Sequence, residues 1–397
     1  MKVLHTSDWH LGQNFMGKSR VEEHQAFLSN LLQIINEKQI DVLLVSGDIF
    51  DTGTPPNYAL ELYYNFLKEL SSIKTLLTTI ITAGNHDSIS TLKAPKQLLE
   101  VLNVHVITTG DVDEKNIIPI YKNEALTSIV CAVPFLREGV IRASLGGETI
   151  SQKEQLANSG IKAYYENCHT KALELKNDKQ IPIIAMGHLT TVGSCSSQSE
   201  RDIYIGGTID IGGDYLASMF DYVALGHLHI NQIVGNNQHV RYSGSPIPLS
   251  FSESKNTPKV NFVTLEENRI DIEELEIPLF RKLLVIKGDG ETIKRELTQI
   301  EDKNSWIEVH IKDDNPMAVN GEIREFASKR DLTLLAVKID KSEKQLKSNE
   351  LQVISLDELS VEQVFERRLE LEELEDKEFQ EELLLNFKQV VSKVQSL

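Results

Sequence analysis

Residues 41–51, DVLLVSGDIFD, decide the fold predicted for this chain. The segment contains a run of branched apolar residues with no polar alternation, a pattern typical of a strand buried on both faces. The run ends at Gly47, which lets the backbone turn tightly, and Asp48 and Asp51 follow it. The segment therefore predicts a buried strand with two carboxylates, Asp48 and Asp51, just after its carboxyl end.

The same arrangement recurs through roughly the first 275 residues. Further short apolar runs occur at residues 2–6, 76–84, 128–133, 181–187 and 222–226. Between them, apolar residues at helical spacing in segments 21–35 and 63–70 predict amphipathic helices. Buried strands that alternate with helices indicate a layered α/β core.

Residues that suit metal ions or acid–base chemistry follow five of these runs. The clusters are DWH (8–10), GDIFD (47–51), GNHD (84–87), GH (187–188) and GHLH (226–229). Strand ends in an α/β sheet meet at one crevice, so clusters far apart in sequence become neighbours. One such cluster alone carries little weight, but together they use five of the 11 histidines. We therefore expect a single site built from all five.

The residue types in these clusters predict a metal centre. Carboxylate, imidazole and carboxamide ligands without a thiolate favour octahedral Mn²⁺ or Fe²⁺ over structural zinc. The number of ligands suits two ions about 3.5 to 4 Å apart that share one bridging carboxylate, for which we expect Asp48. The predicted ligands are Asp8, His10, Asp48, Asn85, His188, His227 and His229.

Such a pair of ions predicts phosphoryl chemistry. Two ions lower the pKa of a bridging water and neutralise charge on the phosphate oxygens in the transition state. His86 is not needed as a ligand and can donate a proton to the departing alkoxide, with Asp87 holding its ring. The predicted catalytic residues are Asp48, His86 and Asp87.

Taken in order, the clusters resemble the motifs of calcineurin-like metallophosphoesterases. Longer stretches, among them HTSDWHLGQNF (5–15), GDIFDTGTPP (47–56) and RYSGSPIPLSF (241–251), resemble the bacterial SbcD family of nuclease subunits. The resemblance extends from residue 1 to about 376 and includes LSVEQVFERRLELEEL (359–374). It implies an α/β fold: a layered α/β/β/α core, a small α+β capping domain and a C-terminal helical tail.

The resemblance also implies an activity and partners. Members of this family are Mn²⁺-dependent DNA nucleases, with double-strand exonuclease and hairpin or single-strand endonuclease activity, in recombination, replication and repair. The implied partners are DNA ends and hairpins and an SbcC-type ATPase with long coiled coils, in a heterotetramer that contains a dimer of this subunit. By motif, Asp8, His10, Asp48 and His229 would hold one ion, and Asp48, Asn85, His188 and His227 the other. Archaeal and eukaryotic relatives carry His where this chain has Asp51, so no role is carried over to that position.

The apolar pattern changes near Pro278 and divides the chain into three predicted parts. These are a large α/β domain at residues 1–275, a small α+β domain at 276–342, and a linker and an acidic helical tail at 343–397. The resemblance implies that the first is the catalytic domain and the second the DNA-capping domain. In the capping domain we expect strands at 283–286, 306–311 and 332–339 and helices at 291–300 and 321–328. The resemblance implies that the tail binds the partner's coiled coil, for which Val361, Val364, Phe365 and Leu369 are the candidates; alternatively, the tail packs on its own protein.

The net charge of −18 opposes bulk electrostatic attraction to DNA, but its distribution weakens that argument. Residues 357–382 contain twelve acidic and three basic side chains, a net charge of −9, so half of the excess lies in the tail. Bound divalent ions would offset more of it. The candidate phosphate contacts near the motifs are Lys18, Arg20, Arg137 and Arg241.

Residues 12–19, GQNFMGKS, also satisfy the P-loop pattern G-x-x-x-x-G-K-[ST]. Ser19 and Glu22 are spaced as a capping box for a following helix. A P-loop follows its strand directly and uses small residues to wrap phosphates, whereas Phe15 and Met16 fill this segment. We therefore favour a segment that binds no nucleotide, and the family resemblance implies that ATP use belongs to the partner.

The composition excludes several classes of protein. With 41% hydrophobic and 25% charged residues the chain has average globular composition, and Cys131, Cys168 and Cys195 are too few for a disulfide framework. No signal-peptide core and no run of about 18 apolar residues are present, so we expect a cytoplasmic protein without a membrane partner. Two alternatives to a nuclease stay open: a small-molecule phosphodiesterase or phosphatase, and a scaffold that holds DNA ends without cutting them.

Overall fold

The computed structural model describes most of the chain. The described residues are 1–93, 96–110, 114–141, 149–197, 200, 203, 209–266, 269–313, 315–339, 364–365, 368–369 and 383–391. None of the helices within these residues is long and apolar enough to cross a membrane.

The first of two large sheets contains the amino-terminal strand and has the strand order β16-β15-β1-β4-β5-β6. Its four parallel strands are β1 (Lys2–Thr6), β4 (Val42–Ser46), β5 (Thr78–Thr82) and β6 (Val104–Ile107). The antiparallel strands β15 (Lys259–Glu266) and β16 (Arg269–Glu276) complete one edge. The first strand is thus paired with a strand from the far end of the catalytic region.

The second sheet has the order β13-β14-β12-β9-β8-β7. Its central strands β8 (Ala125–Cys131), β9 (Ile183–His188), β12 (Tyr222–Gly226) and β14 (Asn237–Tyr242) are parallel. The edge strands β7 (Ile117–Lys122) and β13 (Gln232–Val234) pair with it as antiparallel hairpins. All six predicted apolar runs are strands of these two sheets.

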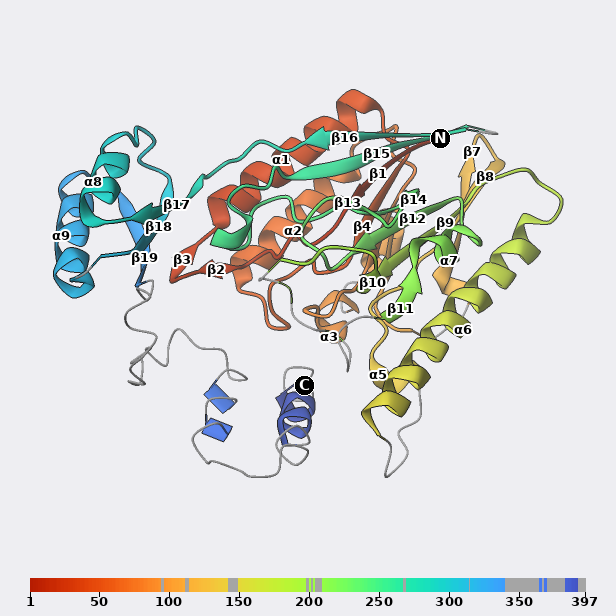
Figure 1. Cartoon of the computed structure of the whole chain (residues 1–397). Helices are drawn as coiled ribbons and strands as arrows, with labels where there is room; N and C mark the ends of the chain where they lie inside the picture. Colours follow the sequence, from red (N-terminus) through yellow and green to blue (C-terminus); the bar gives the residue numbers. More distant parts are fainter. Residues whose placement is uncertain are drawn as a thin grey trace.

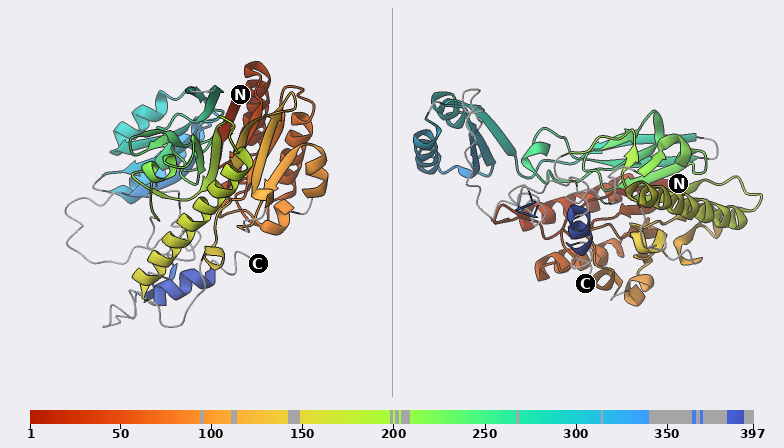
Figure 2. Two further views of the ribbon diagram at one scale, coloured as in Figure 1. Left: turned by 90° about the vertical axis from the view of Figure 1, so that its right-hand side faces the viewer. Right: turned by 60° about the horizontal axis from the view of Figure 1, so that its bottom comes forward.

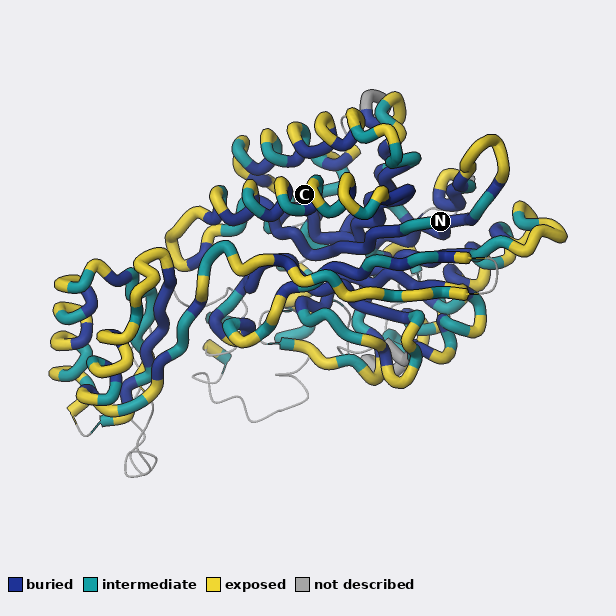
Figure 3. Tube along the Cα trace, turned by 90° about the horizontal axis from the view of Figure 1, so that it is seen from above, coloured by how far each residue is buried: buried dark blue, intermediate teal, exposed yellow. Residues whose placement is uncertain are grey.

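The two sheets pack face to face, and helices cover their outer faces (Figure 1). Val3 and Leu44 of the first sheet meet Ile184 and Met186 of the second in an apolar layer. Figure 3 shows these strands as the buried centre of the molecule. Helices α1 (Val21–Lys38) and α2 (Asn57–Leu70) cover the first sheet, and α6 (Ile150–Lys176) and α7 (Gly213–Ala217) the second. The predicted α/β/β/α core is confirmed.

Shorter elements lie between the main strands and helices. They are α3 (Ile89–Lys93), α4 (Lys96–Val101), α5 (Glu138–Ile141), the 3₁₀ turns η1 (Glu114–Asn116) and η2 (Phe251–Glu253), and the strand pair β10 (Thr191–Val192) and β11 (Ile209–Gly212).

The P-loop-like segment forms a hairpin of two short strands, β2 (Asn14–Phe15) and β3 (Lys18–Ser19). Its two central residues, Met16 and Gly17, both have positive φ (48° and 81°), as a type I′ turn requires. Helix α1 begins after it at Val21, and its N-cap Arg20 makes no side-chain capping bond. The predicted capping box is therefore wrong, and the segment is not built as a phosphate-wrapping loop.

A small α+β unit lies at one end of the molecule (Figure 2). Its parallel sheet contains β17 (Leu283–Gly288), β18 (Trp306–Ile311) and β19 (Thr333–Ile339). Helices α8 (Gly290–Thr298) and α9 (Pro316–Lys329) pack on it around a core that includes Ile293 and Val309. Helix α9 begins five residues before the predicted Gly321, because Pro316 is favourable in a first helical turn.

The predicted helical tail is described only in part. Residues 383–391 are helical, and the Phe387 ring stacks on Phe365 with 3.9 Å between the ring centroids. Of the predicted partner-binding residues, Val364, Phe365 and Leu369 are described and Val361 lies outside the described residues.

Candidate metal centre

Both sheets contribute to one site at the carboxyl ends of their central strands. Asp8 and His10 follow β1, Asp48 follows β4, and Asn85 follows β5, all in the first sheet. His188 ends β9, and His227 and His229 follow β12 in the second sheet. The centre therefore lies where the two sheets meet, and neither sheet holds the full ligand set alone.

Left-handed backbone turns aim the ligands of the first sheet into this space. Asp8, His10 and Asp48 have φ values of 53°, 46° and 50°, which non-glycine residues seldom adopt. Two backbone bonds hold the turns together, from Asp8 N to Gly47 O and from His10 N to Asp48 O, both 3.0 Å. Strained backbone of this kind concentrates at functional sites, where surrounding structure fixes it.

One group of candidate ligands contains Asp8, His10 and His229, whose ligand atoms lie within 4.8 Å of one another. His10 Nδ1 is 3.2 Å from Asp51 Oδ1, and His229 Nδ1 is 3.0 Å from Glu253 Oε1. These bonds place the proton on Nδ1 and leave the Nε2 lone pair for an ion. His10 Nε2 is buried without a hydrogen-bond partner, which is the state expected of an atom whose partner is a metal ion.

A second group contains Asp48, His188 and His227, again with ligand atoms within 4.8 Å. Asn85 Oδ1 joins it, at 2.9 Å from His188 Nε2. His188 Nδ1 is 3.0 Å from Ser46 O, so its Nε2 also faces the centre. Asp48 Oδ2 lies 3.3 Å from His188 Nε2 and 3.6 Å from His10 Nε2. Asp48 thus stands between the two groups, as a bridging ligand must.

Two glycines allow the backbone to pack closely around the centre. A Cβ atom at Gly84 would lie 2.1 Å from Asp48 Oδ1, and one at Gly226 would lie 1.8 Å from Ser46 O. Neither distance is tolerated by real atoms, so both positions need glycine for close approach. Asp8 is fixed as well, since Ser7 Oγ donates to its Oδ2 at 2.6 Å and the His227 amide donates to the same carboxylate.

The buried carboxylates control the protonation of the histidines. Burial alone would lower the pKa of His10, but the bond to Asp51 and the charges of Asp48, Asp51 and Asp8 outweigh it and raise the pKa to about 9. Burial likewise opposes protonation of His188, and the charge and bond of Asp48 raise its pKa to about 9. His10 and His188 therefore favour their charged forms beside these carboxylates, whereas burial lowers the pKa of His227 and His86.

His86 lies beside both groups. Its Nδ1 is 2.7 Å from Asp51 O, its amide donates to Asp48 Oδ1 at 2.9 Å, and its ring centroid is 4.9 Å from that of His10. The bond at Nδ1 fixes the ring and leaves Nε2 for a substrate. A ligand atom of His86 also lies within 4.8 Å of those of His10 and Asp48, so the ring is within reach of an ion as well.

The prediction that Asp87 holds the His86 ring is wrong. Asp87 is buried, and its oxygens accept the amide hydrogens of Ile49, Phe50 and Gly84 at 3.1, 3.0 and 2.8 Å. These bonds join the turns after β4 and β5, and the backbone carbonyl of Asp51 orients His86 instead. Burial and the charge of Asp48 raise the pKa of Asp87 to about 6.

The four predicted DNA contacts lie in different environments. Lys18 is exposed on β3, and half-buried Arg137 donates to Asp87 O at 3.3 Å beside the centre. Arg20 is fully buried and pairs with Glu23, and Arg241 is 9% exposed and pairs with Glu274. The guanidinium groups of Arg20 and Arg241 are buried in ion pairs within the protein. Only Lys18 and Arg137 therefore remain candidates for contacts with DNA phosphates.

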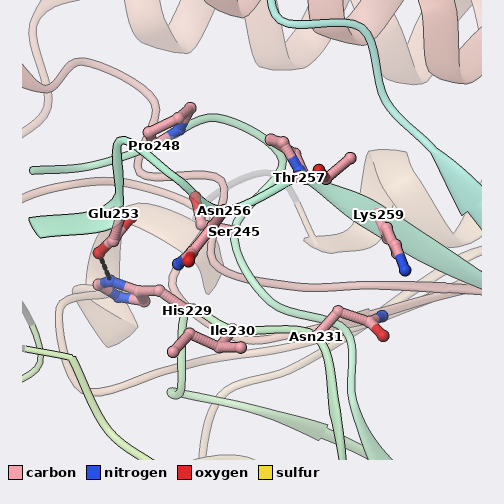
Figure 4. Close-up of a pocket in the computed structure, with 10 residues that line it drawn as sticks. His229, Ile230, Asn231, Ser245, Pro248, Glu253, Asn256, Thr257 and Lys259 are labelled. Atoms are coloured by element: carbon pink, nitrogen blue, oxygen red, sulfur yellow. Dashed lines mark hydrogen bonds and ion pairs between the residues drawn. The ribbon is translucent and has the colours of Figure 1, made fainter. Parts of the chain in front are cut away.

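Three acidic residues support the centre without having been predicted. They are Asp51 and Glu253, described above, and Glu200, whose Oε1 accepts the His229 amide at 2.7 Å. Glu253 Oε2 also accepts the Leu249 amide at 2.7 Å. Figure 4 shows Glu253 bonded to His229 at the wall of a pocket of about 250 Å³, with Ser245, Pro248 and Asn256 nearby. Asp51 belongs to the GDIFD cluster, but no sequence pattern marks Glu200 or Glu253.

Comparison with known proteins agrees with this chemistry. The model of the calcineurin-like phosphoesterase family matches residues 1–231. A second model, described as the type 5 capsule protein repressor C-terminal domain, matches residues 279–373. The fold and the metal-ligand clusters thus define a metal-dependent phosphodiester hydrolase.

Similar curated proteins narrow the class further. The SbcD component of the SbcCD nuclease of Escherichia coli K12 is 39% identical over 96% of this chain and 95% of that protein. The corresponding protein of Rhodobacter capsulatus is 38% identical over 64% of each chain, and that of Bacillus subtilis 30% identical over 79% of each. The chain belongs to the SbcD family of nuclease subunits, and the resemblance stated from its motifs is confirmed.

Proposed function

We propose that this chain cuts DNA phosphodiester bonds with two divalent ions, for which Mn²⁺ is our choice. The observation that carries the proposal is the position of Asp48 between two groups of ligands, one with Asp8, His10 and His229 and one with Asn85, His188 and His227. When bound, such ions supply a nucleophilic hydroxide and neutralise charge on the phosphate. The mixed nitrogen and oxygen ligands favour Mn²⁺ over structural zinc.

In this proposal His86 protonates the leaving oxygen of the cut strand. The Asp51 carbonyl accepts the Nδ1 hydrogen, so the transferred proton comes from Nε2. Burial lowers the pKa of His86, which makes its protonated ring a stronger acid toward an alkoxide. Asp87 supports this step only indirectly, by joining the turn before His86 to the turn after Asp48.

We also propose the partners and setting of the SbcD family for this chain. The names of the relatives designate them components of a nuclease complex, SbcCD, which supports an SbcC-type ATPase as the partner. The proposed assembly is a heterotetramer with two copies of this chain, which processes DNA ends and hairpins in recombination, replication and repair. Its proposed location is the cytoplasm, which the three free cysteines support.

The proposed division of labour follows the three parts of the chain. Residues 1–275 carry the chemistry, 276–342 select DNA geometry, and the tail after residue 343 binds the ATPase through Val361, Val364, Phe365 and Leu369. Lys18 and Arg137 are the proposed phosphate contacts, since one is exposed and the other lies beside the centre. Nucleotide binding is left to the partner, because residues 14–19 form a hairpin.

The proposal is tested by cleavage of an end-labelled DNA duplex, with the chain alone and with SbcC plus ATP, in Mn²⁺ and in EDTA. We expect cleavage that requires Mn²⁺ and is lost in Asp48→Asn. Lys18→Ala should leave ATP binding by the complex unchanged. Hydrolysis of a small phosphodiester with no DNA cleavage in any mixture would contradict the nuclease and support the small-molecule phosphodiesterase.

The proposed role of the tail has its own test. A chain that ends at residue 339 should hydrolyse a small phosphodiester at the wild-type rate but no longer co-purify with SbcC. Co-purification of the shortened chain would show that the ATPase binds elsewhere.

A further inference from the structure

An aromatic and cationic cluster joins the small unit to the catalytic core. The Phe15 ring of the β2–β3 hairpin stacks on Trp306 at the start of β18, with centroids 5.3 Å apart and planes at 21°. Phe251 meets the Phe15 ring edge-on at 5.2 Å, and Leu283 completes the cluster. All four side chains are nearly fully buried, so the two parts of the chain share a small core of their own.

Two arginines cover this cluster. The Arg281 guanidinium lies 4.6 Å from the Trp306 ring centroid, and that of Arg20 lies 5.3 Å from Phe15 and 5.7 Å from Trp306. Both arginines bond to Glu23 of α1, a buried carboxylate. A buried charge is tolerated only when it is paired, and here Glu23 pairs with one arginine from each side of the contact.

A series of hydrogen bonds connects the cluster to the residues around the metal centre. Arg20 Nη1 donates to Gln13 Oε1 at 3.0 Å, and the Gln13 amide donates to His10 O at 3.1 Å. Gln13 Nε2 donates to Leu249 O at 3.2 Å, and the Leu249 amide donates to Glu253, the residue that holds His229. His10 and His229 belong to the same group of candidate ligands. Contacts of the small unit therefore end on the segments that position two histidines.

We propose that Phe15, Arg20 and Trp306 are positioning residues that fix the orientation of the small unit relative to the metal centre, and so set the geometry of DNA that can be cut. This inference rests on the proposed DNA cleavage. The inference also assigns a role to the P-loop-like segment, because its Phe15 and the flanking Arg20 are the residues of the catalytic domain that contact the small unit. A long DNA substrate needs both parts in register, whereas a small phosphodiester needs only the centre.

Trp306 itself provides a readout that needs neither metal nor activity. The chain has two tryptophans, and both Trp9 and Trp306 are buried. Phe15→Ala removes the partner of Trp306 and leaves the probe in place, and Phe15→Tyr keeps a ring that can stack. Phe262→Ala is the matched control, since Phe262 packs against the core of the first sheet and lies outside the cluster.

The experiment measures acrylamide quenching of the metal-free proteins, and then Mn²⁺-dependent cleavage of duplex DNA and of a small phosphodiester. In Phe15→Ala we expect a red-shifted, more easily quenched Trp306. The KM for DNA should rise by about tenfold or more while kcat on the small substrate stays within about twofold. Phe15→Tyr should restore both properties, and Phe262→Ala should change neither.

Three outcomes would overturn the inference: a Trp306 that stays shielded in Phe15→Ala, an exposed Trp306 with an unchanged KM for DNA, or equal losses on both substrates. Failure of the proposed function is a separate result, because wild-type protein would then cut no DNA. Quenching would still decide whether the ring stack holds the small unit in place.

Discussion

Asp51 affects two histidines through two different atoms. Its carboxylate bonds to His10 Nδ1, and its backbone carbonyl bonds to His86 Nδ1. Partners of this kind orient a ligand ring and raise its basicity, so their loss weakens metal binding without removing a ligand. A side-chain substitution at this position separates the two effects, because the backbone carbonyl stays.

We expect Asp51→Ala to weaken Mn²⁺ binding by about 10- to 100-fold, the usual effect of losing such a partner. Asp51→Asn, which keeps an acceptor for His10, should lose less. Titration calorimetry with Mn²⁺ measures both, and wild-type affinity in Asp51→Ala would show that the bond to His10 is dispensable.

His86 allows a test of the proposed acid. His86→Gln should lower kcat on a phosphodiester by about 100- to 10,000-fold, because general acid–base catalysis contributes about that much. Mn²⁺ affinity should change little if His86 is no ligand, and calorimetry reports it. His239→Gln, on β14 away from the centre, is the control. A full rate in His86→Gln would contradict the acid, and a large loss of Mn²⁺ affinity would make His86 a ligand.

At the level of elements, the strand ends are the part of the fold that the sequence predicted well. Each strand was predictable because its apolar run is contiguous in the sequence. Each ligand was predictable because it lies in the same segment, after a glycine or a short turn. Helix α9 began earlier than expected, because residues 316–319 of its first turn are not buried in the core and only Pro316 marks the start of a helix. Arg20 could not be placed from sequence, since its burial depends on Phe15 and Trp306, which are far apart in the chain.

The turn after β5 offers an element-scale prediction. Gly84→Ala would place its Cβ 2.1 Å from Asp48 Oδ1, so the carboxylate or the turn must move. We expect kcat to fall by about 100-fold or more, since misplacing a reacting group by about 1 Å has that effect. Steady-state hydrolysis of a small phosphodiester measures it.

Gly321→Ala is the matched control, because Gly321 lies exposed within α9 and an added Cβ meets nothing within 4 Å. This variant should keep full activity and gain about 0.5 to 1 kcal/mol in the free energy of unfolding. A similar loss of activity in both variants would mean that the contact at Asp48 is unimportant.

At the scale of the whole molecule, the packing of the two sheets brings together residues that are distant in the sequence, and these contacts could not be predicted from local patterns. The motifs predicted that all the ligands form one site. That the ligands come from two sheets packed face to face was implied only by the family resemblance. Glu253 was missed because it meets His229 only after the chain has passed through β13, β14 and η2. No local pattern can reveal a partner chosen by such long-range packing.

Two histidines buried away from solvent predict how stability varies with pH. Burial lowers the pKa of His5, between the sheets, and of His24, on α1, to about 3 in each case. Unfolded histidine takes up a proton near pH 6.5, whereas these folded rings stay neutral down to about pH 3. Stability contributed by the neutral rings is therefore present above about pH 6.5 and is lost as the pH falls toward 3.

His24→Leu tests this contribution. Both ring nitrogens of His24 are buried without hydrogen-bond partners, so the variant should be more stable than wild type by about 1 kcal/mol at pH 7.5. Between pH 6 and 4 its stability should fall less steeply, by about 1.4 kcal/mol per pH unit. Urea unfolding across this range measures both, and parallel curves for the two proteins would contradict the prediction.

The division of the ligands between two sheets has a consequence for biosynthesis. Both groups of candidate ligands that Asp48 joins contain a histidine from the second sheet, His227 or His229. A ribosome adds roughly 10 residues per second, so about 20 s separate the synthesis of Asp8 from that of His229. During that interval the nascent chain lacks part of the ligand set for two ions, so we expect it to gain nuclease activity only after His229 has been synthesised.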